Sequence, residues 1–246
     1  MKCPYWLVAV VLGLALAEGL APLPATAEDL QAELQRARTV LQTGRTNEAV
    51  EILSRLIAAS PQPELYFERG IAYTRSGQIA AAFGDLDQAI SLAPNRPEYH
   101  LRRGALLLKT AKYQEALNDL NKVLEIEPAN AEALHTRAKT LFRLDRAALA
   151  VADVSQAMAL SPGDASLYRL RADLLSASGD HRNAILDYDK AIELRPNDAI
   201  AYNNRAVALA NMNKTREAME DVAKSMELAA SPEPRLESRG IQENPW

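Results

Sequence analysis

Residues 66–95 read YFERGIAYTRSGQIAAAFGDLDQAISLAPN, and a similar stretch recurs along the chain. Residues 168–197 read YRLRADLLSASGDHRNAILDYDKAIELRPN, with small and apolar residues at the same offsets. Each stretch holds two helix-like segments that are separated by glycine and closed before proline. Glycine favours the end of a helix, and proline cannot continue one. The pattern therefore predicts a pair of helices in each copy.

A proline marks the period of this repeat. The prolines are 33 or 34 residues apart, and small residues stand 12 and 24 positions before each of them. They are Pro61, Pro94, Pro128, Pro162 and Pro196. A unit of two helices cannot bury its apolar face alone, so neighbouring units must stack. The sequence therefore predicts an all-α protein built as an α-solenoid.

The two quoted stretches resemble tetratricopeptide repeats. The characteristic positions of that family are filled by Tyr66, Gly70, Tyr73, Ala82, Ala89 and Pro94. The resemblance implies a right-handed superhelix of about six helix-turn-helix units within residues 28–232. We place them at about 30–62, 63–96, 97–130, 131–164, 165–198 and 199–232. Glu33, His100 and Leu134 replace the aromatic residue in three units.

The first 27 residues, MKCPYWLVAVVLGLALAEGLAPLPATA, have the pattern of a secretory signal peptide. A positive start at Lys2 precedes an apolar run over residues 5–17, and small residues follow at 25–27. That run is shorter than the roughly 20 residues that span a bilayer. We expect cleavage before Glu28 and no stable membrane span afterwards, with a retained anchor as the alternative. Export would lead to a periplasm, to the outside of the cell or to a thylakoid lumen.

Composition argues against several classes of function. The chain has 28 Lys+Arg against 32 Asp+Glu, whereas a general nucleic-acid binder carries an excess of basic charge. Its single cysteine, Cys3, excludes a disulfide scaffold, and the three histidines form no metal-ligand pattern. Phosphate-binding loops and nucleophile motifs are missing from the sequence. We expect no enzyme activity, no cofactor and no metal.

Charged residues also follow the repeat. The basic set is Arg36, Arg69, Arg103, Arg137, Arg171 and Arg205, and the acidic set is Asp85, Asp119, Asp153, Asp187 and Asp221. Because a recurring acid matches the recurring base, we interpret these residues as paired charges at helix contacts. A polyanion site is the alternative interpretation. The first repeat has Ile52 where the acid would stand, so Arg36 is expected to lack that partner.

In the tetratricopeptide family the first helices line a concave groove that holds extended peptides. Carried over residue by residue, the resemblance implies a mixed apolar and basic groove. Its candidate residues are Phe67, Arg75, Lys109, His135, Lys139, Phe142, Arg143 and Arg169. Lys139 and Arg143 are four residues apart and share a helix face. We expect Phe67 or Phe142 to act as the apolar anchor. A solvated helix face with ordinary charge scatter is the alternative.

These observations favour a non-catalytic scaffold or adaptor that binds a protein or peptide partner. Assistance in assembling an envelope or membrane complex is an expectation from the resemblance and the signal pattern alone. The alternative is a substrate-recognition subunit of an exported enzyme complex.

After the last repeat we expect no separate capping helix. Residues 233–246 are polar and proline-containing, and we expect a mobile tail there. The last helix must then close the array, and its outer surface is expected to be polar. Cover by a partner, or self-association with a second copy through the last repeat, is the alternative.

Overall fold

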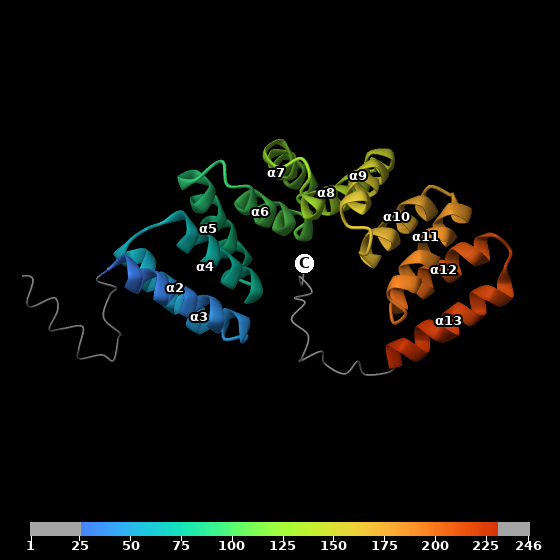
Figure 1. Cartoon of the computed structure of the whole chain (residues 1–246), viewed down its shortest axis with the longest axis horizontal. Helices are drawn as coiled ribbons and strands as arrows, with labels where there is room; N and C mark the ends of the chain where they lie inside the picture. The colour runs from blue at the N-terminus through green and yellow to red at the C-terminus, as the bar shows by residue number, and fades with distance from the viewer. Residues whose placement is uncertain (1–25, 231–246) are drawn as a thin grey trace, which may run out of the picture. The chain divides into compact units, whose positions relative to one another are not determined.

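The computed structural model describes residues 26–230, which form twelve α-helices and no strand. The signal pattern up to residue 25 and the predicted tail lie outside the described residues. The first helices of the pairs are α2 (Ala27–Gln42), α4 (Pro63–Arg75), α6 (Pro97–Lys109), α8 (Ala131–Arg143), α10 (Ala165–Ala177) and α12 (Ala199–Asn211). The second helices are α3 (Thr46–Ala59), α5 (Ile79–Leu92), α7 (Tyr113–Ile126), α9 (Ala147–Leu160), α11 (His181–Leu194) and α13 (Thr215–Ala230) (Figure 1).

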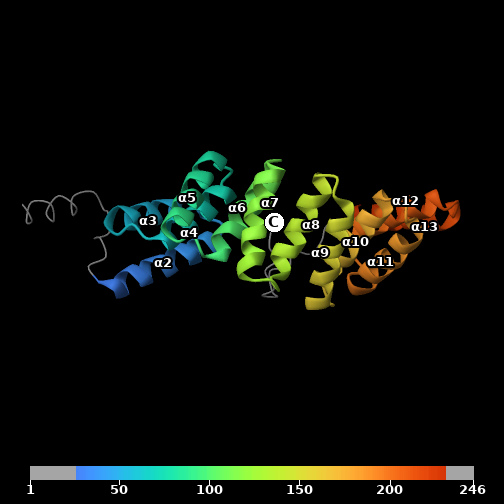
Figure 2. The ribbon, with the colours of Figure 1, turned by 90° about the horizontal axis from the view of Figure 1, so that it is seen from above.

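The chain divides into two compact units, with the boundary after Tyr99 inside α6. In the first unit, α2 packs on α3, α3 on α4, and α4 on α5. In the second unit the same order of neighbours runs without a break from α7 to α13 (Figure 2). None of the helices described in residues 26–230 is both long and apolar enough to cross a membrane.

Each pair turns through one residue in the left-handed backbone region, at the same place in the repeat. Gly44, Gly77 and Gly179 have φ of 80°, 77° and 85°, as the glycine pattern predicts. The other three turns hold Ala111, Asp145 and Asn213, with φ of 60°, 57° and 61°. A side chain in this region costs about 1 kcal/mol relative to glycine. Aspartate and asparagine tolerate this region, so Ala111 is the position where helix packing imposes the turn against the local preference.

Small residues let the two helices of a pair approach closely. A Cβ added to Gly70 would lie 3.1 Å from Cγ of Leu86, and one added to Gly104 would lie 3.2 Å from Cγ of Leu120. The equivalent positions in later pairs are alanines that are buried, such as Ala138 and Ala172. A larger side chain here would force the helices apart.

The predicted arginine–aspartate pairs form in five consecutive helix pairs. Each arginine donates two hydrogen bonds, from Nε and Nη2, to the two oxygens of an aspartate 16 residues later, at 2.6–2.8 Å. Every aspartate of the set is buried. Such bidentate geometry fixes the first helix to the second at a defined register. The scaffold interpretation of these arginines is therefore confirmed.

Arg36 is the exception that the sequence predicts. With Ile52 buried in the place of the acid, Arg36 is exposed and lies 3.4 Å from Glu33 and 3.9 Å from Glu48. Exposed ion pairs of this kind contribute little to stability.

The first turn of α2 contains the predicted cleavage site. Oγ1 of Thr26 accepts a hydrogen bond from the Asp29 amide at 3.1 Å, and a carboxylate oxygen of Asp29 accepts one from the Thr26 amide at 3.1 Å. This capping box satisfies two backbone donors at once. Cleavage before Glu28 would remove Thr26 and with it the cap.

Arg137→Ala should lower the free energy of unfolding by about 1–4 kcal/mol, because it leaves the buried carboxylate of Asp153 unpaired. Arg36→Ala is the matched control and should lower it by less than about 1 kcal/mol. Urea denaturation followed by circular dichroism measures both. Equal effects of the two substitutions would contradict the assigned role of the pair.

Candidate functional site

The first helices of the pairs in the second unit bring polar and apolar side chains onto one face, named the inner face here. Lys139 on α8, Asp173 on α10 and Val207 on α12 are separated by 34 residues each, so they occupy equivalent positions. The same holds for His135, Arg169 and Asn203, which are a further equivalent set on these helices. Because α10 contacts both α8 and α12, the three helices present a continuous surface.

Two cations dominate this surface at α8. Lys139 and Arg143 are one turn apart and exposed, and neither forms an ion pair with a described acid. Desolvation by the surrounding protein lowers the pKa of Lys139, and the nearby charges of Arg169 and Arg143 lower it further. The Lys139 ammonium is thus exposed and partly desolvated, with the charges of Arg169 and Arg143 nearby. Such a site favours an incoming anion.

His135 lies one turn before Lys139 and is half-buried. Desolvation, followed by repulsion from Lys139, lowers the pKa of His135 to about 4, although Asp164 acts in the opposite direction. The imidazole is therefore neutral at pH 7, where one nitrogen can donate a hydrogen bond and the other can accept one.

Arg169 is only partly available to a ligand. Its Nε lies 3.0 Å from Oδ2 of Asp198, and the other oxygen of Asp198 accepts hydrogen bonds from the amides of Ile200 and Ala201. Asp198 thus caps α12 while it pairs with Arg169. The arginine links α10 to the start of α12 and adds less free charge than the sequence suggests.

Asp173 joins three helices through hydrogen bonds. It accepts from the hydroxyl of Tyr188 on α11 at 2.6 Å and from Nδ2 of Asn204 on α12 at 2.9 Å. Burial raises the pKa of Tyr188, and the neighbouring carboxylate of Asp173 raises it further. The phenol therefore stays protonated and acts as a structural donor.

The remaining predicted groove residues are used mostly in packing. In the first unit, the ring of Phe67 lies 4.7 Å from that of Tyr99, and Nη1 of Arg75 donates to the Leu41 carbonyl at 3.0 Å. In the second unit, Phe142 is half-buried against the core and Lys109 is exposed in the last turn of α6. The structure thus brings His135, Lys139, Arg143 and Arg169 together, and places Phe67 and Arg75 in a different unit.

Sequence reasoning missed two apolar residues on α12. Ile200 and Val207 are 56% and 53% exposed, on the helix that follows the cationic and polar ones. A signal was present, because Val207 stands in register with Lys139 and Asp173. Phe142, a predicted anchor, is packed against the core. Ile200 and Val207 are therefore the apolar side chains that a ligand can contact instead.

In the first unit, the basic residue of the inner face is neutralised within the chain. Arg38 donates to Glu64 at 2.5 Å and to Glu68 at 2.7 Å. These hydrogen bonds and charges raise the pKa of Arg38 against the opposing effect of burial. Among the described residues of the first unit, Arg38 is therefore no counterpart of the unpaired cations on α8.

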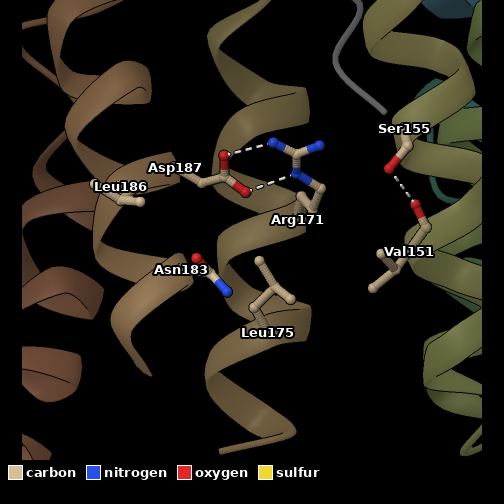
Figure 3. Close-up of a pocket in the computed structure, with 7 residues that line it drawn as sticks. All are labelled: Val151, Ser155, Arg171, Leu175, Asn183, Leu186 and Asp187. Atoms are coloured by element: carbon tan, nitrogen blue, oxygen red, sulfur yellow. Dashed lines mark hydrogen bonds and ion pairs between the residues drawn. The ribbon is translucent and has the colours of Figure 1, made fainter. Parts of the chain in front are cut away.

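A hollow is lined by side chains of α9, α10 and α11. It has a volume of about 290 Å³ and is lined by Val151, Ser155, Arg171, Leu175, Asn183, Leu186 and Asp187 (Figure 3). Arg171 is held by both oxygens of Asp187 at 2.7 Å, and the hydroxyl of Ser155 donates to the Val151 carbonyl. Its polar side chains are all engaged, since Asn183 also donates to Asp180 outside the hollow, so it is a weaker candidate than the α8–α12 surface.

Metal chemistry finds no support within residues 26–230, where three His, Cys, Asp or Glu side chains nowhere gather in a ligand set. His100 is instead buried in the scaffold, where Nδ1 lies 3.1 Å from the Asp119 carboxylate. Burial alone would raise the pKa of the Asp119 carboxyl. The hydrogen bonds and charges of Arg103 and His100 together outweigh burial and lower that pKa.

Four family models match the chain. Three are described as tetratricopeptide repeat, over residues 34–97, 97–130 and 199–232, and one is described as TPR repeat, over residues 172–213. The chain contains tetratricopeptide repeats. No curated protein matches this sequence significantly.

Solved structures agree with an all-α solenoid of repeats. PilF of Pseudomonas aeruginosa has a TM-score of 0.72 at 16% identity and covers 82% of this chain and 93% of its own. A tetratricopeptide repeat protein from Parabacteroides merdae has a TM-score of 0.72 at 22% identity, covering 82% and 80%. YrrB, described as a TPR protein with an unusual peptide-binding site, has a TM-score of 0.60 at 19% identity, covering 73% and 93%. At these identities the likeness establishes the fold.

Proposed function

We propose that this protein is a non-catalytic interaction scaffold that binds an extended segment of a partner across α8, α10 and α12. The observation that carries the proposal is the pair of exposed cations, Lys139 and Arg143, for which the described residues supply no acid. The arginines of the scaffold are bound to buried aspartates. Lys139 and Arg143 differ from them because neither cation has an acidic partner among the described residues. A protein of similar fold, YrrB, is described as having an unusual peptide-binding site, which supports peptide binding by this chain.

The surface favours a segment that carries an acid and an apolar residue. Cationic groups lie on α8, and the exposed Ile200 and Val207 lie on α12. Packed helices are about 8–10 Å apart, so α8 and α12 are separated by roughly 20 Å. An extended chain covers that distance in about six residues. Asp173 on α10 lies between the two ends and can accept hydrogen bonds, and neutral His135 beside the cations on α8 can donate or accept one.

Charge reversal at α8 tests this function. Lys139→Glu with Arg143→Glu should weaken binding of a glutamate-containing peptide by roughly 2–4 kcal/mol, because attraction becomes repulsion. The probes are synthetic peptides with glutamates and a leucine about six residues apart, measured by calorimetry at two salt concentrations. Lysine-for-glutamate peptides serve as the ligand control.

Arg146→Glu with Arg182→Glu is the matched control variant, because both arginines are exposed and belong to the second-helix half of their repeats. It should leave peptide affinity nearly unchanged, and circular dichroism checks folding of both variants. Unchanged affinity and salt dependence in the Lys139/Arg143 variant would place the site elsewhere.

We also propose that the protein acts outside the cytoplasm, where it assists assembly of an envelope or membrane complex. The supporting observation is the tripartite pattern of the first 27 residues. Mass spectrometry of the protein from its native host should show Glu28 as the first residue. Recovery of a soluble chain that still begins at Met1 would contradict export.

A further inference from the structure

The last helix exposes an apolar face at the C-terminal end of the array. Met219, Val222 and Met226 are 68%, 41% and 67% exposed. The exposed small residues beside them on the same face are Thr215, Ala223, Ala229 and Ala230. At 100° per residue these positions fall within about 120° of the helix circumference, an arc without a charged side chain. The charged residues of α13 lie outside this face.

Earlier helix pairs bury this same surface. The residues 34 positions before Met219, Val222 and Met226 are Ile185, Tyr188 and Ile192, which are half-buried or buried. Ile185 packs against Ala206 and Leu209 of α12 in the following pair. The exposed face of α13 is therefore a stacking surface that no described repeat covers. This finding corrects the expectation that the polar residues of α13 close the array, since they occupy only one flank.

We propose that a second copy of this chain covers the face, with the two α13 helices antiparallel about a two-fold axis near Val222. End repeats of a solenoid need a polar outer surface or a cover. A two-fold contact buries the same patch on both copies and closes the assembly. Ala223, Ala229 and Ala230 permit close approach of the two helices, while Met219 of one copy meets Met226 of the other.

Charge complementarity selects this arrangement. Along α13 the residues Arg216, Glu220, Lys224 and Glu227 alternate in sign. Arg216 and Glu227 border the face on the same flank, and an antiparallel pair centred near Val222 places Arg216 of each copy opposite Glu227 of the other. A parallel pair would place this charged flank against the uncharged flank of the second copy and would form no such ion pair. Within one chain, Arg216 lies 3.7 Å from Glu220 and Lys224 lies 3.0 Å from Glu227, in exposed pairs that exchange partners at little cost.

The segment after Ala230 fits the face less well. It carries Pro232, Pro234 and Pro245 and spreads Leu236, Ile241 and Trp246 among charged residues. In the preceding pair, the position equivalent to this face contacts the helix that follows. In a second copy, α13 is the apolar helix that can take the place of that following helix. Because one helix face is smaller than the standard interface of about 800 Å² per partner, we expect a dissociation constant in the micromolar range.

Sedimentation equilibrium of the full chain at about 1 µM and about 100 µM tests the proposal, since the dimer population follows protomer concentration. Dimer should dominate at the higher concentration. Met219→Glu with Met226→Glu should raise the dissociation constant at least about 100-fold. Leu186→Glu is the matched control, because Leu186 is an exposed apolar residue on α11, and it should leave the dimer unchanged.

A charge swap tests the antiparallel register. Arg216→Glu should weaken the dimer about 10-fold, and adding Glu227→Arg should restore it. Circular dichroism confirms that each variant remains helical. A monomer at both concentrations, a dimer that survives the methionine substitutions, or a swap that does not restore association would overturn the proposal. So would dimerisation seen only after Leu236→Ser, Ile241→Ser and Trp246→Ser, which would assign the face to the chain's own C-terminal segment.

Discussion

The bidentate arginine–aspartate pair is the contact on which the described fold depends. It joins the first and second helices of five consecutive pairs with the same 16-residue separation and the same pair of hydrogen bonds. Each aspartate is buried, so an unpaired carboxylate would be strongly unfavourable. In three pairs the remaining guanidinium nitrogen also reaches the preceding repeat, at Ser54, Asn121 or Asp189. The pair therefore sets register within a repeat and contact between repeats.

The same side chain has different roles according to its surroundings. Arg137 faces Asp153 and Asn121 and is part of the scaffold, whereas Arg143, less than two turns later on α8, is exposed without an acidic partner. The scaffold arginines neutralise the buried acids, so cations on the inner face are not needed for that purpose and can remain without an acidic partner. Lys139 and Arg143 are such unpaired cations. Arg38 in the first unit is not, because Glu64 and Glu68 neutralise it.

Much of the fold could be predicted because the same residue types recur at the same positions of each repeat. The 34-residue period predicts the helix pairs, and the recurring Arg and Asp predict their ion pairs, including the exception at Arg36. Properties that depend on what lies beyond a residue could not be read in this way. The left-handed turn at Ala111 follows from packing against local preference, and the packing of Phe142 follows from its neighbours in space. The exposure of Met219 follows from the absence of a further described repeat.

A double-mutant cycle at Arg171 and Asp187 tests the central claim most directly. At this pair Nη1 of Arg171 makes no hydrogen bond to the described residues, so the cycle isolates the contact within one repeat. Unfolding free energies of the native chain, Arg171→Ala, Asp187→Ala and the double variant give the coupling energy. The account predicts coupling of at least about 1 kcal/mol, with the double variant less unstable than the sum of the two single changes. Additive effects, with coupling near zero, would contradict it.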